Sequence, residues 1–315
     1  MYFISSAIKL SRSFLASLRD STLHWAAHAS LERIRGKPLE ARKVYETVLA
    51  SDNQIHYAAC LYWEWAEMEW LSGNRDQAVG ILLRSVGSQS IDGVHLLRAR
   101  RTFAERCSDT RHWQSRYSWI RAQALFDLLT SGDMTSALSS FDRYLENEVP
   151  SSLEHECLTV SSLLLVYHYL IKLKNPGKPS VLRDRVNKAL ELYSSNSIVI
   201  GLFLEGEKGQ GVWGRVRTFL GESENADKGV VRRAIEVWIP SWEKGRWEAE
   251  VERTRSGLLT AVESERYYYS FLSTSAISLT RFSAGNTVQF FGDFSWSLRF
   301  GQGLCRTQRS YYTGL

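Results

Sequence analysis

Two imidazoles and a carboxylate on one face of a predicted helix are the first candidates for chemistry. His24, His28 and Glu32 follow one another at intervals of four residues, and side chains of these types can bind zinc. A structural role is the alternative, because in an internal repeat described below His28 and Glu32 align with Trp65 and Glu69, which belong to the packing framework of a helical hairpin. We therefore expect no metal site at this face.

Other catalytic patterns do not favour an enzyme. The glycine-rich run at 206–211 has no strand before it and lacks the Gly-Lys-Ser/Thr of a phosphate-binding loop, so it predicts a turn between helices. No Gly-x-Ser-x-Gly motif occurs, and the spacing of Ser, His and Asp suggests no triad. We interpret the acidic pairs Glu67/Glu69 and Glu146/Glu148 as solvated helix faces. The sequence predicts a non-catalytic protein with no cofactor.

A cationic helix over 94–107 is the third candidate, and it carries Arg98, Arg100 and Arg101. These arginines could contact RNA phosphates or an acidic partner; a solvated outer face is the alternative. The chain has a net charge of +5, of which 271–315 contributes +3 through four arginines and one acid. The rest of the chain shows no concentrated basic face of the kind that nucleic-acid-binding domains usually carry.

A 37-residue internal repeat defines the elements that carry these residues. Segment 57–86 predicts two antiparallel helices that are broken at Ser72-Gly73-Asn74, and an earlier copy aligns Gly36 with Gly73. Small residues recur where two helices would cross closely, and large ones recur where they would fill the groove. A repeat of this length and layout is the signature of a helical-hairpin solenoid. The framework positions are Trp25, Ala29, Glu32, Ala41, Val44 and Tyr45 in the first copy and Tyr62, Trp65, Ala66, Glu69, Ala78, Ile81 and Leu82 in the second.

The first copy resembles a half-a-TPR (HAT) repeat in two motifs, WAAHASLE at 25–32 and ARKVYETVL at 41–49. Together with LYWEWAEMEW at 61–70 and weaker matches near 211–220 and 242–266, the order of segments is most similar to the NRDE (nuclear RNAi-defective) family. The resemblance covers roughly residues 20–270. It implies a right-handed α-α superhelix that serves as a non-catalytic scaffold in the nucleus, linked to RNA interference, heterochromatin and RNA processing and surveillance.

The resemblance also implies partners. They are nuclear RNA-processing proteins, among them spliceosomal proteins and the exosome-associated RNA helicase. In the family the helicase contact is attributed to a segment N-terminal to the repeats, so we expect it outside this chain. Two alternatives remain open. One is a HAT scaffold of pre-mRNA splicing or mRNA 3′-end processing, which would often be dimeric. The other is direct RNA binding through Arg98, Arg100 and Arg101 and the arginines of the C-terminal segment.

The expected domain organisation is a HAT-like helical array over 1–270, with a candidate bend at 175–179 (NPGKP), followed by an atypical, poorly ordered tail at 271–315. The array includes a third, degenerate hairpin over 113–147. The apolar content of 44% and only five prolines favour an ordered, helix-rich protein. The tail contains no Lys or Glu and shows no helical period, so we hypothesise that it is not repeat sequence, as at a mis-spliced or frame-shifted gene end.

The N-terminus, the cysteines and the hydropathy indicate cellular context. The first nineteen residues lack acids, as a mitochondrial transit peptide would, but Ile4, Ile8, Leu15 and Leu18 keep helical spacing and favour a helix that leads into the first repeat. The four scattered cysteines favour buried thiols in a reducing compartment over a zinc site or disulfides. The sequence contains no run of eighteen apolar residues, so it does not predict a membrane span.

Overall fold

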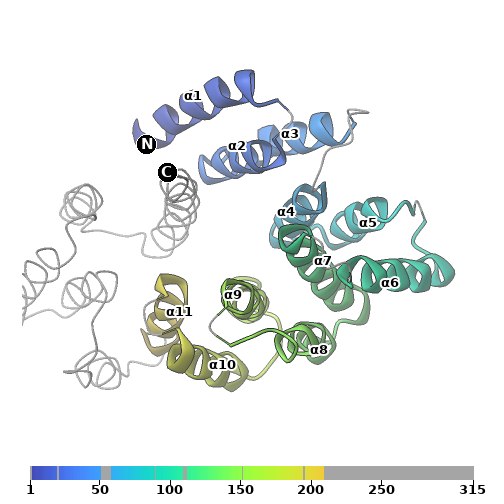
Figure 1. Ribbon diagram of the computed structural model, residues 1–315, viewed down its shortest axis with the longest axis vertical. Coiled ribbons are helices and arrows are strands. Elements are labelled where there is room, and N and C mark those ends of the chain that lie inside the picture. The colour runs from blue at the N-terminus through green and yellow to red at the C-terminus, as the bar shows by residue number, and fades with distance from the viewer. Residues whose placement is uncertain are drawn as a thin grey trace, which may run out of the picture. The chain divides into compact units, whose positions relative to one another are not determined.

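The fold is known from a computed structural model, which describes residues 2–19, 21–50, 58–88, 90–108, 112–150, 152–193 and 196–208 (Figure 1). These residues form eleven α-helices and one π-helical segment and contain no strand, which confirms the all-α prediction for this part of the chain. The predicted repeats after residue 208 and the predicted tail at 271–315 lie outside the described residues. The chain divides into two units, Met1–Leu182 and Arg183–Leu315, which are considered separately.

The first unit consists mainly of helical hairpins. Its helices are α1 (Tyr2–Ser17), α2 (Thr22–Ile34), α3 (Pro38–Ala50), α4 (Ala58–Leu71), α5 (Arg75–Ser85), α6 (Gly93–Cys107), α7 (Trp113–Ser131), α8 (Met134–Leu145), α9 (Leu153–Tyr167) and the π-helical η1 (His168–Lys172). Helix α10 (Pro179–Leu192) crosses into the second unit, which also contains α11 (Ser197–Lys208). In α11 Val199, Ile200 and Leu204 are buried, as the spacing of an amphipathic helix requires.

The first two hairpins turn in the same way, 37 residues apart. Gly36 and Gly73 have φ angles of +82° and +85°, in the left-handed region that favours glycine. Each glycine N–H donates to the carbonyl three residues earlier at 3.0 Å, and the next residue donates to the carbonyl five residues earlier at 2.9 Å. This pair of hydrogen bonds is a Schellman motif. The predicted internal repeat is therefore reproduced at the level of backbone geometry.

Successive hairpins pack through their first helices. Helix α2 pairs with α3, α4 with α5 and α7 with α8, and between hairpins α2 contacts α4, α4 contacts α7 and α7 contacts α9. Figure 1 shows this progression from the blue hairpin α2/α3 to the green helices α8 and α9. Because α4 and α7 pack against helices on several sides, polar residues in them become buried along with apolar ones.

Segment α6–α8 repeats the packing positions of α3–α5, at a sequence spacing that differs from that of the first repeat. Ala41, Arg42 and Tyr45 of α3 have counterparts in α6 that lie 58 positions later, and so do Ala66 and Glu69 of α4 in α7. After the turn the spacing becomes 59, which pairs the turn glycines and one alanine of α5 with one of α8. The third-copy counterparts are Ala99, Arg100, Phe103, Ala124, Asp127, Gly132 and Ala137. Segment α6–α8 is thus built on the same plan as α3–α5.

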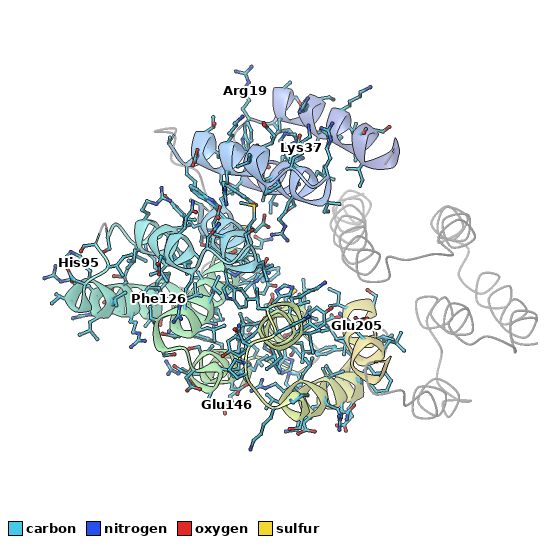
Figure 2. All side chains as sticks on the ribbon, turned by 180° about the vertical axis from the view of Figure 1, so that it is seen from behind. Arg19, Lys37, His95, Phe126, Glu146 and Glu205 are labelled. Atoms are coloured by element: carbon cyan, nitrogen blue, oxygen red, sulfur yellow. The ribbon has the colours of Figure 1, made fainter. Side chains whose placement is uncertain are left out.

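The core is continuous through these hairpins. Its largest fully buried side chains are Trp65, Tyr45, Phe103, Phe126 and Phe141, each 2% exposed or less. Figure 2 shows Phe126 inside the helices, whereas the labelled Arg19, Lys37 and Glu146 lie at the outer surface. Burying aromatic groups of this size is the main source of stability in such a unit.

The N-terminal segment is helical, as the spacing of its apolar residues predicted. Helix α1 packs on α2 and buries Ile8 and Leu15. Leu10 and Phe14 of this helix are 56% and 45% exposed, and Leu18, which was predicted to continue the apolar spacing, follows the helix and is 44% exposed. The apolar face of α1 is therefore wider than the surface that α2 covers.

The helix that begins at Leu153 changes its winding before it ends. Helix α9 runs into η1, and Lys174 then has a φ angle of +53°. Helix α10 begins at Pro179, where proline fits because the first helical N–H has no acceptor within the helix. The segment 175–179 therefore separates helices, as predicted, and the boundary between the two units follows it.

Candidate functional site

Glu69 is the most completely bound carboxylate of the repeat framework. It is fully buried and accepts hydrogen bonds from Arg42 Nε at 2.5 Å, Arg42 Nη2 at 2.6 Å, Asn74 Nδ2 at 2.9 Å and Trp65 Nε1 at 3.2 Å. Burial opposes ionisation, but the hydrogen bonds from Arg42 and Asn74 outweigh it and lower the pKa of Glu69. One carboxylate thus joins α3, α4 and the turn before α5.

Trp65 is held by an aromatic ring, a guanidinium and Glu69. Its ring stacks on Tyr45 with centroids 6.0 Å apart and an interplanar angle of 11°, and Arg84 lies 4.9 Å from its centroid. Only 2% of Trp65 is exposed. Because the partners come from α3, α4 and α5, this residue connects a hairpin with the one before it.

The other framework positions are mostly buried. Ala29, Ala41, Ala66, Ala78, Ile81 and Leu82 have no exposed surface, whereas Trp25, Val44 and Tyr62 are partly buried and pack against the core. The structure therefore brings all of the framework residues named from the sequence into the packed interior or onto its edge. The part of the framework that these residues form is a packing arrangement.

His28 and Glu32 make structural contacts. Glu32 is 2% exposed and pairs with Arg12 at 3.2 Å and Arg35 at 3.7 Å, while His28 Nδ1 lies 3.2 Å from Ser11 Oγ. Burial lowers the pKa of His28, against the opposing effect of Glu32. Among the described residues, no three His, Cys, Asp or Glu side chains are grouped so that they could hold a metal ion.

The interpretation of Glu67 and Glu69 as a solvated face is wrong. Glu69 is fully buried, and only 13% of the Glu67 side chain is exposed, with His168 Nδ1 3.5 Å away and Arg33 Nη1 3.7 Å away. Burial alone would raise the pKa of Glu67, but its neighbours His168, Arg33 and Arg121 lower it to about 2. Helix α4 is covered on most sides, so its polar residues face other helices.

The second acidic pair consists of one exposed and one largely buried glutamate. Glu146 is exposed, as predicted, but the Glu148 side chain is only 18% exposed and pairs with Arg116 at 2.5 Å. The prediction of a solvated face is therefore wrong for Glu148. Arg116 also donates to the carbonyl of Cys107, so this ion pair fixes the end of α6 to the loop after α8.

A small internal space adjoins Glu67. It is lined by aromatic and apolar side chains together with Arg121 and Ser161, and its volume of about 10 Å³ suffices for roughly one water molecule. The Arg121 guanidinium lies 3.0 Å from the Trp63 ring centroid, and its Nε has no hydrogen-bond acceptor among the described atoms. A space of this size cannot accommodate an organic substrate.

The three arginines predicted as a partner contact have different environments. Arg100 Nε lies 3.3 Å from Asp127 Oδ1 and its Nη2 donates to Thr130 Oγ1 at 3.0 Å, although 43% of the side chain remains exposed. Arg101 pairs with Glu105 at 3.0 Å on the exposed surface, and Arg98 is exposed. All three arginines are therefore exposed, but Arg100 is engaged with α7, whereas the ion pair of Arg101 stays within α6.

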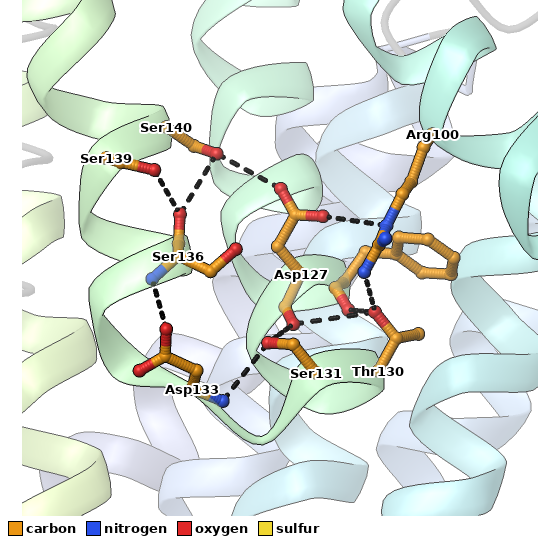
Figure 3. A network of polar contacts seen from close by, with 9 residues as sticks. Arg100, Asp127, Thr130, Ser131, Asp133, Ser136, Ser139 and Ser140 are labelled. Atoms are coloured by element: carbon orange, nitrogen blue, oxygen red, sulfur yellow. Dashed lines mark hydrogen bonds and ion pairs between the residues drawn. The ribbon is translucent and has the colours of Figure 1, made fainter.

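Asp127 is the counterpart of Glu69 that sequence reasoning did not single out. Figure 3 shows its carboxylate between Arg100 and Ser140, which donates to Oδ2 at 3.0 Å, while the backbone carbonyl of Asp127 accepts from Ser131 Oγ at 2.6 Å. Burial raises the pKa of Asp127 despite Ser140 and Arg100. An isolated acid within the apolar run at 124–129 was the signal available in the sequence.

The same polar network includes the N-cap of α8. Asp133 accepts from the backbone N–H groups of Thr135 at 3.0 Å and of Ser136 at 3.1 Å, the second of which Figure 3 shows, and these bonds lower the pKa of Asp133. The polar groups in this network are all engaged in joining α6, α7 and α8. They hold the fold together and leave no side chain poised as a nucleophile.

The cysteines within the described residues are buried or partly buried thiols. Burial raises the pKa of Cys107 to about 12 and raises that of Cys60 well above its usual value. Thiols with raised pKa values are poor nucleophiles at neutral pH. Cys305 lies outside the described residues.

Comparisons with protein-family models, curated proteins and solved structures find no match to this chain. None of the helices that the structure describes has both the length and the apolar character needed to cross a membrane.

Proposed function

We propose that this protein is a non-catalytic scaffold that holds partner proteins on an array of helical hairpins. The observation that carries the proposal is the repeated junction between hairpins. At three places an arginine from the preceding helix pairs with a buried carboxylate near the end of the next hairpin's first helix: Arg12 with Glu32, Arg42 with Glu69, and Arg100 with Asp127. Such junctions link each hairpin to the helix before it and leave the outer surfaces for binding.

The proposed array is a right-handed α-α superhelix. In its support, the first helices α2, α4, α7 and α9 contact one another in sequence, whereas α3, α5 and α8 contact mainly first helices. A tightly spaced row of first helices beside a wider row of second helices is the geometry that curves a solenoid. The first helices would then form the inner row of the array.

The proposed setting is the nucleus, in RNA silencing, heterochromatin and RNA processing or surveillance. Its support is the similarity of the 25–49 and 61–70 motifs to HAT repeats and to the order of segments in the NRDE family. The proposed partners are nuclear RNA-processing proteins, including spliceosomal proteins. The contact with the exosome-associated RNA helicase is proposed to need residues outside this chain.

Affinity purification of the tagged chain from nuclei, followed by mass spectrometry, tests this function. We expect RNA-silencing and RNA-processing proteins to be enriched over a tagged helical-repeat protein of similar length. Exclusion of the chain from nuclei, or enrichment equal to that of the control, would contradict the proposal. Recovery of splicing or 3′-end-processing factors alone, with a dimeric mass by light scattering, would favour a splicing-type scaffold instead.

A further inference from the structure

The outer face of α6 and of the turn before it exposes aliphatic and basic side chains together. Ile91 is 58%, Val94 57% and Leu97 66% exposed, and Arg98 and Arg101 lie beside them. Val94, Leu97, Arg98 and Arg101 are three and four residues apart and therefore share one side of the helix, and Ile91 lies just before its N-cap Asp92; these five residues are here called the α6 face. The opposite side of α6 buries Ala99, Phe103 and Cys107, and α6 packs against α7.

Comparison with α3 shows that the fold does not require this surface. Leu39 lies 58 positions before Leu97 and is similarly exposed, at 63%. The neighbouring positions differ in charge, however, because α3 has Glu40 where α6 has Arg98. In α3 Glu40 pairs with Lys43, at the position equivalent to Arg101, at 3.1 Å. The same site in the repeat is therefore neutral in α3 and basic in α6.

The basic charge of the α6 face is only weakly compensated. Arg101 pairs with Glu105, but their side chains are 84% and 62% exposed, and ion pairs at such exposed sites contribute little. No hydrogen bond or ion pair of Arg98 is seen among the described residues. Charges that stabilise neither the helix nor its packing are available for a partner.

We propose that the α6 face binds an acidic, amphipathic helical segment of a partner protein. Aliphatic side chains of the segment would cover Val94 and Leu97, and its carboxylates would pair with Arg98 and Arg101. This combination of apolar anchors flanked by charge is how helices are recognised on a partner's surface. The inference rests on the proposed scaffold function and identifies the chemistry of one partner contact.

The chemistry of the face favours an acidic protein segment over RNA. Arg100 already pairs with Asp127 of α7, so Arg98 and Arg101 are the arginines of the cluster left for a partner. No aromatic side chain belongs to the face, so unpaired bases would have no ring on which to stack. Three exposed aliphatic residues would instead gain from burial against other aliphatic groups.

Peptide selection tests the proposal on the α6 face itself, whichever protein the partner is. Random peptides of about 16 residues, long enough for an amphipathic helix, are displayed and selected against the full chain, and the selected peptides are made synthetically. We expect Glu and Asp to be enriched between apolar residues at i, i+3 and i+4 spacing. Arg98→Glu, which installs the charge found at the α3 position, should weaken binding about tenfold or more, and Leu97→Glu should abolish it.

Leu39→Glu is the matched control, because it makes the same change at the equivalent exposed position of α3. It should leave peptide binding unchanged, and circular dichroism should show that all three variants keep their helices. Selection of basic peptides, absence of selected peptides, or equal binding to wild type and Leu97→Glu would overturn the proposal. Binding of a fluorescent oligouridylate at ~50 mM salt that Arg98→Glu abolishes would assign the face to RNA instead.

The two proposals fail in different ways. If nuclear purification recovers RNA-processing proteins equally with wild type and with Leu97→Glu while the selection fails, the scaffold function stands and the α6 face is not its contact. If the acidic peptides bind as expected but no nuclear RNA-processing protein is recovered, the face is a binding site and the proposed cellular role is wrong.

Discussion

Segments α3–α5 and α6–α8 solve the same packing problem with different side chains. In both, an arginine (of α3 or of α6) reaches a buried carboxylate 27 positions later, in the helix that follows. An aromatic residue three positions after that arginine packs on a ring of the same following helix. In α3–α5 the carboxylate is Glu69, which receives four hydrogen bonds. In α6–α8 it is Asp127, whose pKa burial raises.

The difference shows which features a repeat must keep and which it can vary. The shorter Asp127 side chain receives Arg100 at 3.3 Å, without the paired guanidinium contacts that Glu69 receives from Arg42. Aromatic packing takes a larger share of the second junction, where the Phe103 and Phe126 rings lie 5.2 Å apart. Position and helix contact are kept, whereas the balance between electrostatic and apolar stabilisation changes.

The largest effect should come from removing the aromatic anchor of the first segment. Trp65→Ala should destabilise the protein by about 3–5 kcal/mol, as expected for a buried Trp, because Tyr45 and Arg84 lose the ring that they contact. Gln123→Ala, at the equivalent position in α7, should cost about 1 kcal/mol through loss of a hydrogen bond with Tyr144. Urea unfolding measures both; equal losses would mean that Trp65 does not anchor its junction more strongly than Gln123 does.

Neutralising Glu69 and neutralising Asp127 should lower the stability by clearly different amounts. Glu69→Gln should destabilise by about 2–3 kcal/mol, because charge-assisted bonds from Arg42 are lost. Asp127→Asn should cost under about 1 kcal/mol, because burial already favours the neutral form of Asp127. Thermal and urea unfolding of both variants at pH 7 provide the measurement, and a larger loss for Asp127→Asn would reverse the comparison.

Acid should act on the two carboxylates in opposite directions. The pKa of Glu69 is lowered from 4.5, so its contribution is present above pH 4.5 and is lost as the pH falls below that value. The pKa of Asp127 is raised from 3.8, so falling pH relieves an unfavourable charge. Compared with wild type, Glu69→Gln should lose stability less steeply below pH 4.5 and Asp127→Asn more steeply. The free energy of unfolding measured from pH 7 down to the acid limit of folding shows the slopes.

The smallest effects concern glycines at and between the turns. Gly73→Ala and Gly132→Ala should each destabilise by about 1 kcal/mol, because both residues have φ angles in the left-handed region. Gly80→Ala, inside α5 where an added Cβ meets no heavy atom within 4 Å, should stabilise by about 0.5–1 kcal/mol. Thermal unfolding distinguishes the signs. A stabilising Gly73→Ala would show that the turn geometry is wrong.

The hairpins were predictable because their signals are local. Gly36, Gly73 and Gly132 each lie five residues before an alanine that the helix crossing buries. Left-handed backbone at the turn and close approach at the crossing both restrict residue type, so the pattern survives in a single sequence. The same cannot be said of the superhelix, which depends on small rotations between hairpins.

The polar residues of the interior were not predictable from local pattern. Glu67 and Glu69 lie in a helix whose charged and apolar residues alternate, so nothing in the segment indicates that Arg42 and His168 approach from other elements. Similarly, Arg98, Arg100 and Arg101 are equivalent in the sequence until α7 is placed beside them. The π-helical winding at His168–Lys172 also gave no signal, because it continues an apolar helix.

The spacing from Asp127 to Gly132 is one residue longer than the spacing from Glu69 to Gly73. This difference indicates that the turn tolerates insertions during evolution. The extra residue replaces the Schellman motif with a single bond from the Gly132 N–H to the Leu128 carbonyl at 2.9 Å, yet Ala137 is still fully buried. The extra residue in the turn between α7 and α8 therefore leaves the buried positions of these two helices in place. The corner after α7 is accordingly a natural place to splice in an epitope or a fluorescent reporter.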